Sequence, residues 1–582
     1  MKKIFLLLAL LCTSLTLSAD PIGEARARQI AEEFFSQYST RSAGGAISLT
    51  WAGNTITEPI STGSQLDNAL MYIYKRGENN GFIVVAGDSN VSPIIAYSLD
   101  STIDTNNMAE ATRDILDAWC KQINAARKEE IAISNTRSAT RSGDELLYET
   151  ALWNQGEPYN REAPIYDGYS SATGCVATAM SIICYHNRWP EYSVGTTPEY
   201  SYYDPYEEIR TVPANTLGRT YDYDNMLLDY NNGYTEEQGN AVAALMKDMG
   251  TSVEMMYHYT GSGAYDVKVI RAFTTYHRYS KEAALLCKDN YDIAIWNEMM
   301  RENLRKCGPT YYSGGSNNSG HAFVIDGYSY NDYFHINYGW GGAGNAWYLL
   351  PNIDYYARQA AIFDLVPDRE GTTAYRDNIM LTEYYTDTFY WRGLFSTATE
   401  YIVGQPFYMY LGVLNNVGAR TFNGHISLVH CNKNGEWKEQ LYTWSVEEFN
   451  IDAMWGLTTD EAVIINSPVD EGDTIQAFFR SYDSDEWIRI RSWGGYAIEE
   501  ILLCATPKQV AKTLSYHYDK LQQVIYLESP NALQTELHRP NGSVESLEMV
   551  GHSYLYYIID SKGEYTLKVR SGGEPYLLKL KF

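Results

Sequence analysis

Cys175 is the side chain best placed for nucleophilic chemistry. It follows Gly174 and precedes a run of small and apolar residues that extends to Cys184. This run predicts a helix buried on most sides, with Cys175 at its N-terminus, where the positive end of the helix dipole lowers a thiol pKa. Because a thiolate attacks carbonyl carbon, Cys175 is a candidate nucleophile. The alternative is a core cysteine that happens to begin a helix.

His321 is the candidate base for this thiol. It stands at the head of the apolar, strand-like segment Ala322–Ile325, 146 residues after Cys175. A cysteine and a histidine so separated in sequence can meet in the fold as a nucleophile and its proton acceptor. The pair is a more specific signal than either residue alone.

Three further residues could complete the site. Gln155 lies 20 residues before Cys175, and its side-chain amide, with the backbone N–H of Cys175, could bind an oxyanion. Asn337 and Trp340 follow His321 and are candidates for orienting the imidazole or shielding it from water. The sequence leaves open which of these two orients it.

These motifs together resemble the streptopain family of papain-fold cysteine peptidases. The resemblance is carried by four segments in the order Gln, Cys, His, Asn: Trp153–Asn160, Ala172–Ala179, Gly320–Gly327 and Asn337–Gly342. Two earlier strand-like segments, Met71–Tyr74 and Gly81–Asp88, resemble the inhibitory prodomain of that family. The likeness spans about residues 20–366, and Tyr338 stands where the family usually has the first of two tryptophans.

The resemblance implies an α+β fold with a two-lobed, papain-like catalytic domain, in which the helix of Cys175 faces the strand of His321. It implies a cysteine endopeptidase made as a zymogen that favours an apolar side chain two positions before the cut (P2). Its partners would be protein or peptide substrates and its own prodomain, acting as an intramolecular inhibitor. No cofactor is implied, and no His, Cys and Asp cluster has the spacing of a metal site.

Composition changes along the chain predict the domain order. We expect a signal peptide (1–19), an α+β inhibitory prodomain (20–130), an activation linker (131–146), the papain-like catalytic domain (147–366), a β-sandwich domain (369–507) and a small C-terminal β domain (508–582). The last two regions alternate short strands with turn signals, and such additions resemble exported peptidases of Bacteroides-group bacteria. They could bind a cell-surface or host ligand.

The N-terminal residues indicate the compartment of the protein, and its net charge limits the kinds of partner. A basic start, a short apolar run and a small-residue site ending at Ala19 predict a secretory signal peptide, and no later segment is long and apolar enough to span a membrane. The protein is therefore expected to be secreted, periplasmic or at the cell surface. A formal net charge of −27 argues against nucleic-acid or anionic-membrane partners.

Two other functions fit parts of the pattern. The same Cys–His pair could transfer an acyl group to an amine, as a transglutaminase does. Alternatively, the papain-like region could be a relic and the β regions an adhesin, although every catalytic position is filled.

Overall fold

The computed structural model describes residues 21–103 and 145–581, with gaps, and scattered residues between 116 and 127. The longer gaps are 38–44, 61–64, 78–80, 316–319, 351–354, 504–513, 529–533, 549–554 and 571–574. The chain divides into two compact units. The first comprises Met1–Leu147, Gly327–Tyr338 and Gly342–Tyr356, and the second comprises Tyr148–Asp326, Gly339–Gly341 and Ala357–Phe582.

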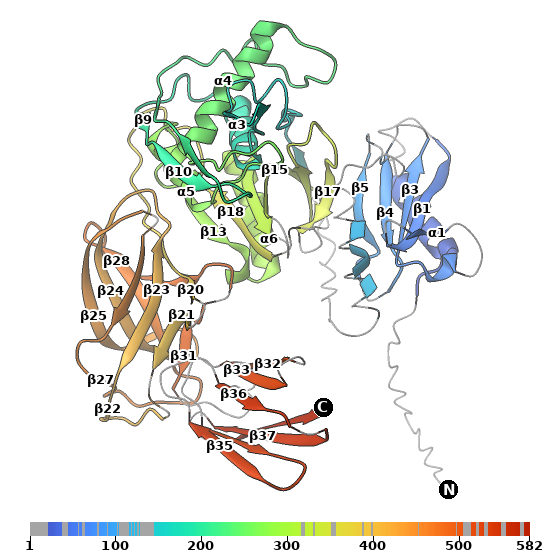
Figure 1. The fold of residues 1–582 in the computed structure, drawn as a ribbon. Helices are drawn as coiled ribbons and strands as arrows, with labels where there is room; N and C mark the ends of the chain where they lie inside the picture. The colour runs from blue at the N-terminus through green and yellow to red at the C-terminus, as the bar shows by residue number, and fades with distance from the viewer. Residues whose placement is uncertain are drawn as a thin grey trace, which may run out of the picture. The chain divides into compact units, whose positions relative to one another are not determined.

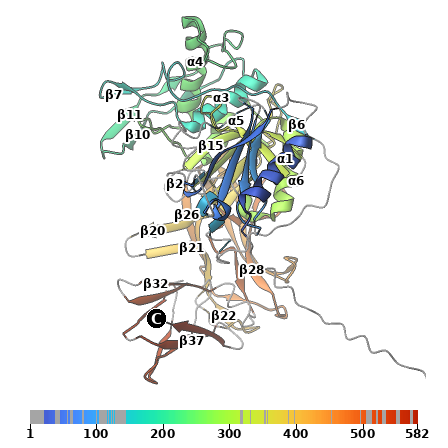
Figure 2. The same cartoon turned by 90° about the vertical axis from the view of Figure 1, so that its right-hand side faces the viewer.

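The first unit is a helix packed on an antiparallel sheet. Its described helices include α1 (Glu24–Gln37) and the short η1 (Leu66–Asn68). Its sheet runs in the order β16 (Tyr333–Asn337), β17 (Ala346–Leu349), β5 (Ile94–Ser98), β4 (Phe82–Ala86), β3 (Met71–Arg76), β1 (Ile47–Thr55) and β2 (Glu58–Pro59). The strand β6 (Leu146–Leu147) pairs with Gly327 and Tyr328. Helix α1 lies across the face of β3 and β4 (Figure 2), where Phe34 and Phe35 join a buried cluster with Tyr74 and Ile83.

The predicted prodomain elements are confirmed where the structure describes them. The helix expected from Glu24 is α1, and the two strand-like segments are β3 and β4. Their burial follows from the sequence, since every residue of β4 is apolar and buried. The signal peptide and the activation linker lie outside the described residues, as does most of a second predicted helix over about 110–128.

A strand from the N-terminal region pairs with a strand from far along the chain. In β5, Ala96 and Tyr97 pair antiparallel with Tyr348 and Trp347 of β17. The rings of Tyr97 and Trp347 stack with centroids 6.1 Å apart. The expected prodomain therefore continues one sheet with the β16–β17 hairpin, which carries Asn337 at the end of β16.

The second unit contains the helices around Cys175. These are α3 (Cys175–Asn187), α4 (Glu236–Ser252), α5 (Val267–Thr275), α6 (Ile293–Cys307) and the short η2 (Lys288–Asn290). They accompany strands in the order β13 (Ala284–Cys287), β18 (Ala357–Phe363), β14 (Thr310–Gly315) and β15 (Gly320–Tyr328). Figure 1 labels β13, β18 and β15. Small pairs complete this part: β7 (Ile165–Tyr166) with β8 (Tyr169–Ser170), β9 (Thr196–Thr197) with β12 (Asn215–Thr216), and β10 (Tyr200–Tyr203) with β11 (Ile209–Val212).

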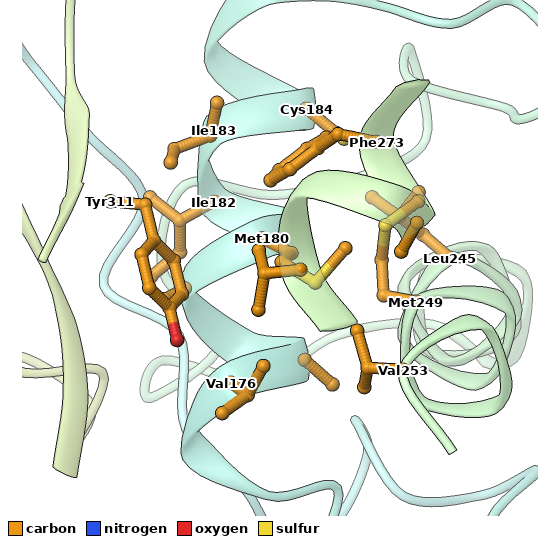
Figure 3. Packing of buried hydrophobic residues seen from close by; sticks show 14 of the residues in the cluster. Val176, Met180, Ile182, Ile183, Cys184, Leu245, Met249, Val253, Phe273 and Tyr311 are labelled. Carbon is orange, nitrogen blue, oxygen red and sulfur yellow. The ribbon is translucent and has the colours of Figure 1, made fainter. Parts of the chain in front are cut away.

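The core of this region surrounds α3. Met180 and Cys184 face helices α4 and α5, and Tyr311 of β14 packs on the side where Val176 and Ile182 lie (Figure 3). All nine residues from Val176 to Cys184 are buried. The predicted buried helix is therefore confirmed, and it begins at Cys175 itself.

The remaining chain is β structure, as predicted. One sheet has β20 (Glu383–Thr386), β21 (Phe389–Ser396), β23 (Met409–Asn416), β19 (Ile379–Leu381) and β30 (Arg491–Ser492), with β26 (Met454–Thr458) on β23. The other has β25 (Trp437–Phe449), β24 (Phe422–Cys431), β28 (Thr474–Ser481) and β29 (Ile488–Arg489), with β31 (Glu500–Leu502) on β28, and β22 (Pro406–Phe407) pairs with β27 (Val463–Ile464). Both sheets supply side chains to one buried cluster, so they form a sandwich.

The C-terminal strands form two smaller sheets around a second cluster. They are β32 (Ser515–Asp519), β33 (Val524–Glu528) and β36 (Leu555–Ile558), and β35 (Val544–Glu548), β34 (Gln534–His538), β37 (Glu564–Arg570) and β38 (Tyr576–Lys581). The predicted break near Pro507 lies outside the described residues. The expected α+β class with β-rich C-terminal regions is confirmed.

Candidate active site

Gly174 sets the start of α3 and the position of the candidate nucleophile. It is the N-cap residue, with φ of 86° and ψ of 145°. A Cβ at this position would lie 2.6 Å from Met255 Sδ and 3.1 Å from the Ser262 carbonyl oxygen. Only glycine fits both this backbone conformation and this close approach. Cys175 is therefore the first helical residue, and it is partly exposed while the rest of its helix is buried.

A loop after α4 holds the segment that leads into Cys175. The Ser262 hydroxyl donates to the carbonyl of Ala172 at 2.7 Å and accepts from the backbone N–H of His258 at 2.9 Å. We expected the glycine-rich segment from Thr260 to Ala264 to line a cleft. The structure instead shows that Ser262 of this segment holds the backbone at Ala172, three residues before Cys175, by a hydrogen bond.

His321 is the second residue of β15 and lies in a sheet position opposite Gly314 of β14. Its side chain is buried, with 8% of the residue exposed. The backbone N–H of the next residue, Ala322, acts on the thiol of Cys175 and lowers its pKa. Helix α3 and strand β15 therefore meet at Cys175 and Ala322, directly after His321.

Burial dominates the electrostatics of the thiol. Desolvation raises the Cys175 pKa, and the Asp266 carboxylate raises it further, whereas the backbone N–H groups of Ala322 and Val176 oppose the shift. The net pKa of the Cys175 thiol is raised from its ordinary value. The helix N-terminus alone thus leaves the thiol protonated, so formation of a thiolate needs a proton acceptor.

Gln155 lies beside the turn before α3. The backbone N–H of Thr173 donates to the Gln155 carbonyl at 3.0 Å, and the Gln155 N–H donates to the side chain of Asn154 at 2.8 Å. The residue is partly exposed, and its side-chain amide makes no hydrogen bond to the described residues. The main chain of Gln155 is therefore bonded to Thr173, which lies two residues before Cys175 in the sequence. The side-chain amide of Gln155 is available to a ligand.

Trp340 packs against His321. Their ring centroids are 4.7 Å apart with 33° between the planes. The next residue, Gly341, donates its N–H to the carbonyl of Trp153 at 2.9 Å, which ties Trp340 to the segment that carries Gln155. Gly339 has φ of 70°, and a Cβ there would come within 3.0 Å of Thr178 on α3.

Four further polar residues have separate surroundings. Asn337 is buried at the end of β16, in the first compact unit, so its predicted role toward His321 stays a prediction. His335, also on β16, packs edge-on to Trp347 with centroids 5.2 Å apart. His186 lies 3.4 Å from the Glu149 carbonyl oxygen, and Asp326 accepts a hydrogen bond from Thr150. In the second unit, the structure brings together Cys175, His321, Gln155 and Trp340.

Asp266 is a site residue that sequence reasoning did not identify. It precedes the apolar pattern of α5 and would be interpreted as a helix cap. Its carboxylate instead accepts hydrogen bonds from Tyr311 at 2.6 Å and Ser313 at 2.9 Å, and its charge acts on Cys175. No local pattern links these residues, because Tyr311 and Ser313 lie 45 and 47 positions further along the chain.

Two family models and several known proteins match parts of the chain. The model of the peptidase C10 family matches residues 153–348, and the model of the Spi protease inhibitor matches residues 19–123. The thiol protease/hemagglutinin PrtT of Porphyromonas gingivalis is 32% identical over 365 residues, which are 60% of this chain and 41% of PrtT. Streptopain of Streptococcus pyogenes is 27% identical over 365 residues, which are 59% of this chain and 90% of streptopain.

Solved structures give a further likeness. A fragment of prointerpain A from Prevotella intermedia is 24% identical and covers 57% of this chain and 100% of the fragment, with a TM-score of 0.44. The family matches take in Gln155, Cys175, His321 and Trp340, and the inhibitor match takes in α1 and strands β1 to β5. Residues 153–348 therefore match the peptidase C10 family, to which the chain is similar through streptopain, and residues 19–123 match a Spi-type protease inhibitor.

Proposed function

We propose that this chain is an exported cysteine endopeptidase made as a zymogen, with Cys175 as nucleophile and His321 as base. The observation that carries the proposal is the meeting of Cys175, the first residue of α3, with β15 at Ala322, directly after His321. A raised thiol pKa makes a proton acceptor necessary, and His321 is the titratable side chain at that point of the strand.

The chemistry is acyl transfer to water. His321 takes the proton of the Cys175 thiol, and the thiolate attacks the scissile carbonyl carbon. The imidazolium then gives its proton to the leaving amine as the C–N bond breaks, which leaves a thioester. Water, losing a proton to His321, attacks the thioester and releases the acid and the free thiol.

Gln155 and the backbone N–H of Cys175 would bind the oxyanion that forms in both steps. Two facts support this role for Gln155: its side chain has no hydrogen-bond partner among the described residues, and its main chain is bonded to Thr173. Trp340 would hold the His321 ring and keep water from it, as their packing at 4.7 Å suggests. Asn337 remains the alternative orienting residue.

Zymogen behaviour would follow from the β5–β17 pairing. The expected prodomain shares a sheet with the β16–β17 hairpin, which carries Asn337. Before cleavage, strand β17 of this hairpin is therefore paired with the prodomain strand β5. We propose that cutting within residues 131–146 releases it. The other finer expectations are proposals too: an apolar preference at P2, export after removal of residues 1–19, and a cell-surface or host ligand for the C-terminal β regions. Among the helices that the structure describes, none could cross a membrane.

Intact mass spectrometry tests the proposal. Purified residues 20–582 and the Cys175→Ala variant are incubated in reductant, with and without a broad cysteine-peptidase inhibitor. The parent should lose a fragment that ends within 131–146 and gain one adduct at Cys175, and the variant should do neither. If both chains stay whole and unlabelled, trypsin is added to cut the linker. If Cys175 of the parent is still unlabelled after that cut, the peptidase assignment is wrong. Crosslinked product on addition of a primary amine would instead indicate transglutaminase chemistry.

A further inference from the structure

Asp266 directs its carboxylate away from the helix that it precedes. It stands at the N-cap position of α5, but its backbone is helical (φ −56°, ψ −34°) and its side chain makes no cap hydrogen bond. An aspartate at an N-cap normally accepts a hydrogen bond from the first turn of its own helix. Here that stabilisation is given up, so the contacts that the carboxylate makes instead need an explanation.

Those contacts lie on β14. Oδ1 accepts from the Tyr311 hydroxyl at 2.6 Å and Oδ2 accepts from the Ser313 hydroxyl at 2.9 Å. Figure 3 shows the Tyr311 side chain along α3, with its hydroxyl toward the end of the helix where Cys175 begins. Each carboxylate oxygen can accept two hydrogen bonds, and each accepts one from the described residues. Asp266 is also partly exposed.

The carboxylate lies close to the reacting atoms. Ser313, which holds Oδ2, is paired across the sheet with Ala322, whose N–H acts on the Cys175 thiol. The charge of Asp266 is itself one of the causes that raise the thiol pKa. A substrate bound with its scissile carbonyl at Cys175 would therefore bring neighbouring side chains near Asp266.

The negative charge of Asp266 is poorly compensated. Burial raises the pKa of Asp266 against the opposing effects of its two hydroxyl donors and of the exposed Arg358. Within the described part of the chain, Asp266 forms no salt bridge. A cation that reached the carboxylate would gain a charge-assisted hydrogen bond, a stronger contact than a neutral one.

We propose that Asp266 is a specificity-determining residue that selects substrates with a lysine or arginine side chain next to the scissile bond. The inference rests on the proposed function, because it takes Cys175 as the nucleophile. It adds to the apolar P2 preference, since the aliphatic stem of a basic side chain can pack on apolar neighbours while its head reaches the carboxylate. Ala264 and Val267, on either side of Asp266 in the chain, are partly buried apolar residues.

The test compares peptides that differ at one position. The activated enzyme is assayed on a series in which each of the three positions before the cut is lysine, arginine or norleucine in turn. For the parent, kcat/KM should favour the basic residue at one of these positions by about 10-fold or more. Asp266→Asn, which keeps the size of the side chain, should remove that preference. Because the Asp266 charge also acts on the Cys175 thiol, the readout is the ratio of kcat/KM for the basic and norleucine peptides, which should fall to about 1. Asp266→Glu should retain the preference.

The control is Asp292→Asn. Asp292 also precedes a helix, α6, makes no side-chain cap bond and is exposed, so its loss should leave the preference unchanged. An equal fall of kcat/KM for all peptides in Asp266→Asn would show that Asp266 only supports the strand or the thiol, and would overturn the inference. So would a parent that cleaves basic and norleucine peptides equally at every position.

A labelling experiment separates failure of this inference from failure of the proposed function. The rate at which Cys175 reacts with a cationic methanethiosulfonate is compared with the rate for a neutral one, which needs no peptidase activity. Asp266 should accelerate the cationic reagent relative to the neutral one, and Asp266→Asn should abolish the difference. Equal rates in the parent would count against the charge effect, whereas absent peptide cleavage with a normal rate difference would count against the peptidase assignment alone.

Discussion

The backbone N–H of Thr173 donates to the carbonyl of Gln155 at 3.0 Å, which fixes the candidate oxyanion donor beside the turn before Cys175. The bond uses only main-chain atoms of Gln155, so the side chain can be changed without breaking it. Gln155 is therefore a position where a catalytic effect can be separated from a folding effect.

Gln155→Ala should lower kcat by about 100-fold to 1000-fold with little change in KM, since an oxyanion donor acts mainly in the transition state. Steady-state kinetics on a peptide substrate measures this. Alkylation of Cys175 by iodoacetamide forms no oxyanion and should proceed at the parent rate. Equal losses in alkylation and hydrolysis would mean that the variant disturbs the thiol instead.

Trp340→Ala should lower kcat by about 10-fold or more, because the ring that packs 4.7 Å from His321 is removed and the imidazole gains freedom. Trp340→Phe keeps a flat ring and should fall between the parent and the alanine variant. Kinetics of the three proteins, matched for the fraction of Cys175 that an inhibitor labels, is the measurement. Identical kcat values in all three would assign the orienting role elsewhere, with Asn337 as the next residue to test.

Gly174→Ala should destabilise the protein by about 2 kcal/mol or more. A non-glycine residue is strained at φ of 86°, and its Cβ would lie 2.6 Å from Met255 Sδ. Gly156→Ala is the matched control, since no atom lies within 4 Å of a Cβ there. Thermal unfolding in the Cys175→Ala background avoids self-digestion. A similar melting temperature for both variants would contradict the close packing before Cys175.

His277 should make stability fall in acid. Its ring is fully buried between Ser193 at 2.7 Å and Ser252 at 2.9 Å, and burial lowers its pKa from 6.5 to about 3. The unfolded chain takes up a proton below about pH 6.5, whereas the folded chain does so only near pH 3. Stability is therefore lost as pH falls through this window, by roughly 2–3 kcal/mol between pH 6.5 and pH 4.5.

Comparing the parent with His277→Gln, both in the Cys175→Ala background, isolates this contribution. Glutamine keeps hydrogen-bonding groups for the two serines but does not titrate, so the parent should lose more stability than the variant between pH 6.5 and pH 4.5. Chemical unfolding at several pH values measures the difference. Parallel curves for the two proteins would mean that His277 is not the titrating group.

The sequence predicts the parts of the site that depend on local pattern. The helix at Cys175 has a run of small and apolar residues, and the strand at His321 and the prodomain strands β3 and β4 contain short apolar runs. The proximity of Trp340 to His321 followed from the family resemblance, because no spacing rule brings an indole to an imidazole 19 residues away.

Other features depend on contacts between distant segments. Asp266 precedes an amphipathic helix, which suggests a cap, and only the packing of β14 beside α5 shows that its carboxylate is used elsewhere. Likewise, the glycine-rich sequence around Ser262 favours a cleft-lining loop, and only the structure shows its hydrogen bond to Ala172. Tertiary packing decided both cases, which is where local propensity has least influence.

The pairing of β5 with β17 has a consequence for the mature enzyme. While the prodomain is attached, β17 is an interior strand with hydrogen-bonded neighbours on both sides. Excision of the prodomain would turn it into an edge strand, with the backbone groups of Trp347 and Tyr348 open to any extended segment that can align with them. Activation by the proposed cut would therefore exchange an internal partner for a surface on which another strand can add, including a strand from a second activated molecule.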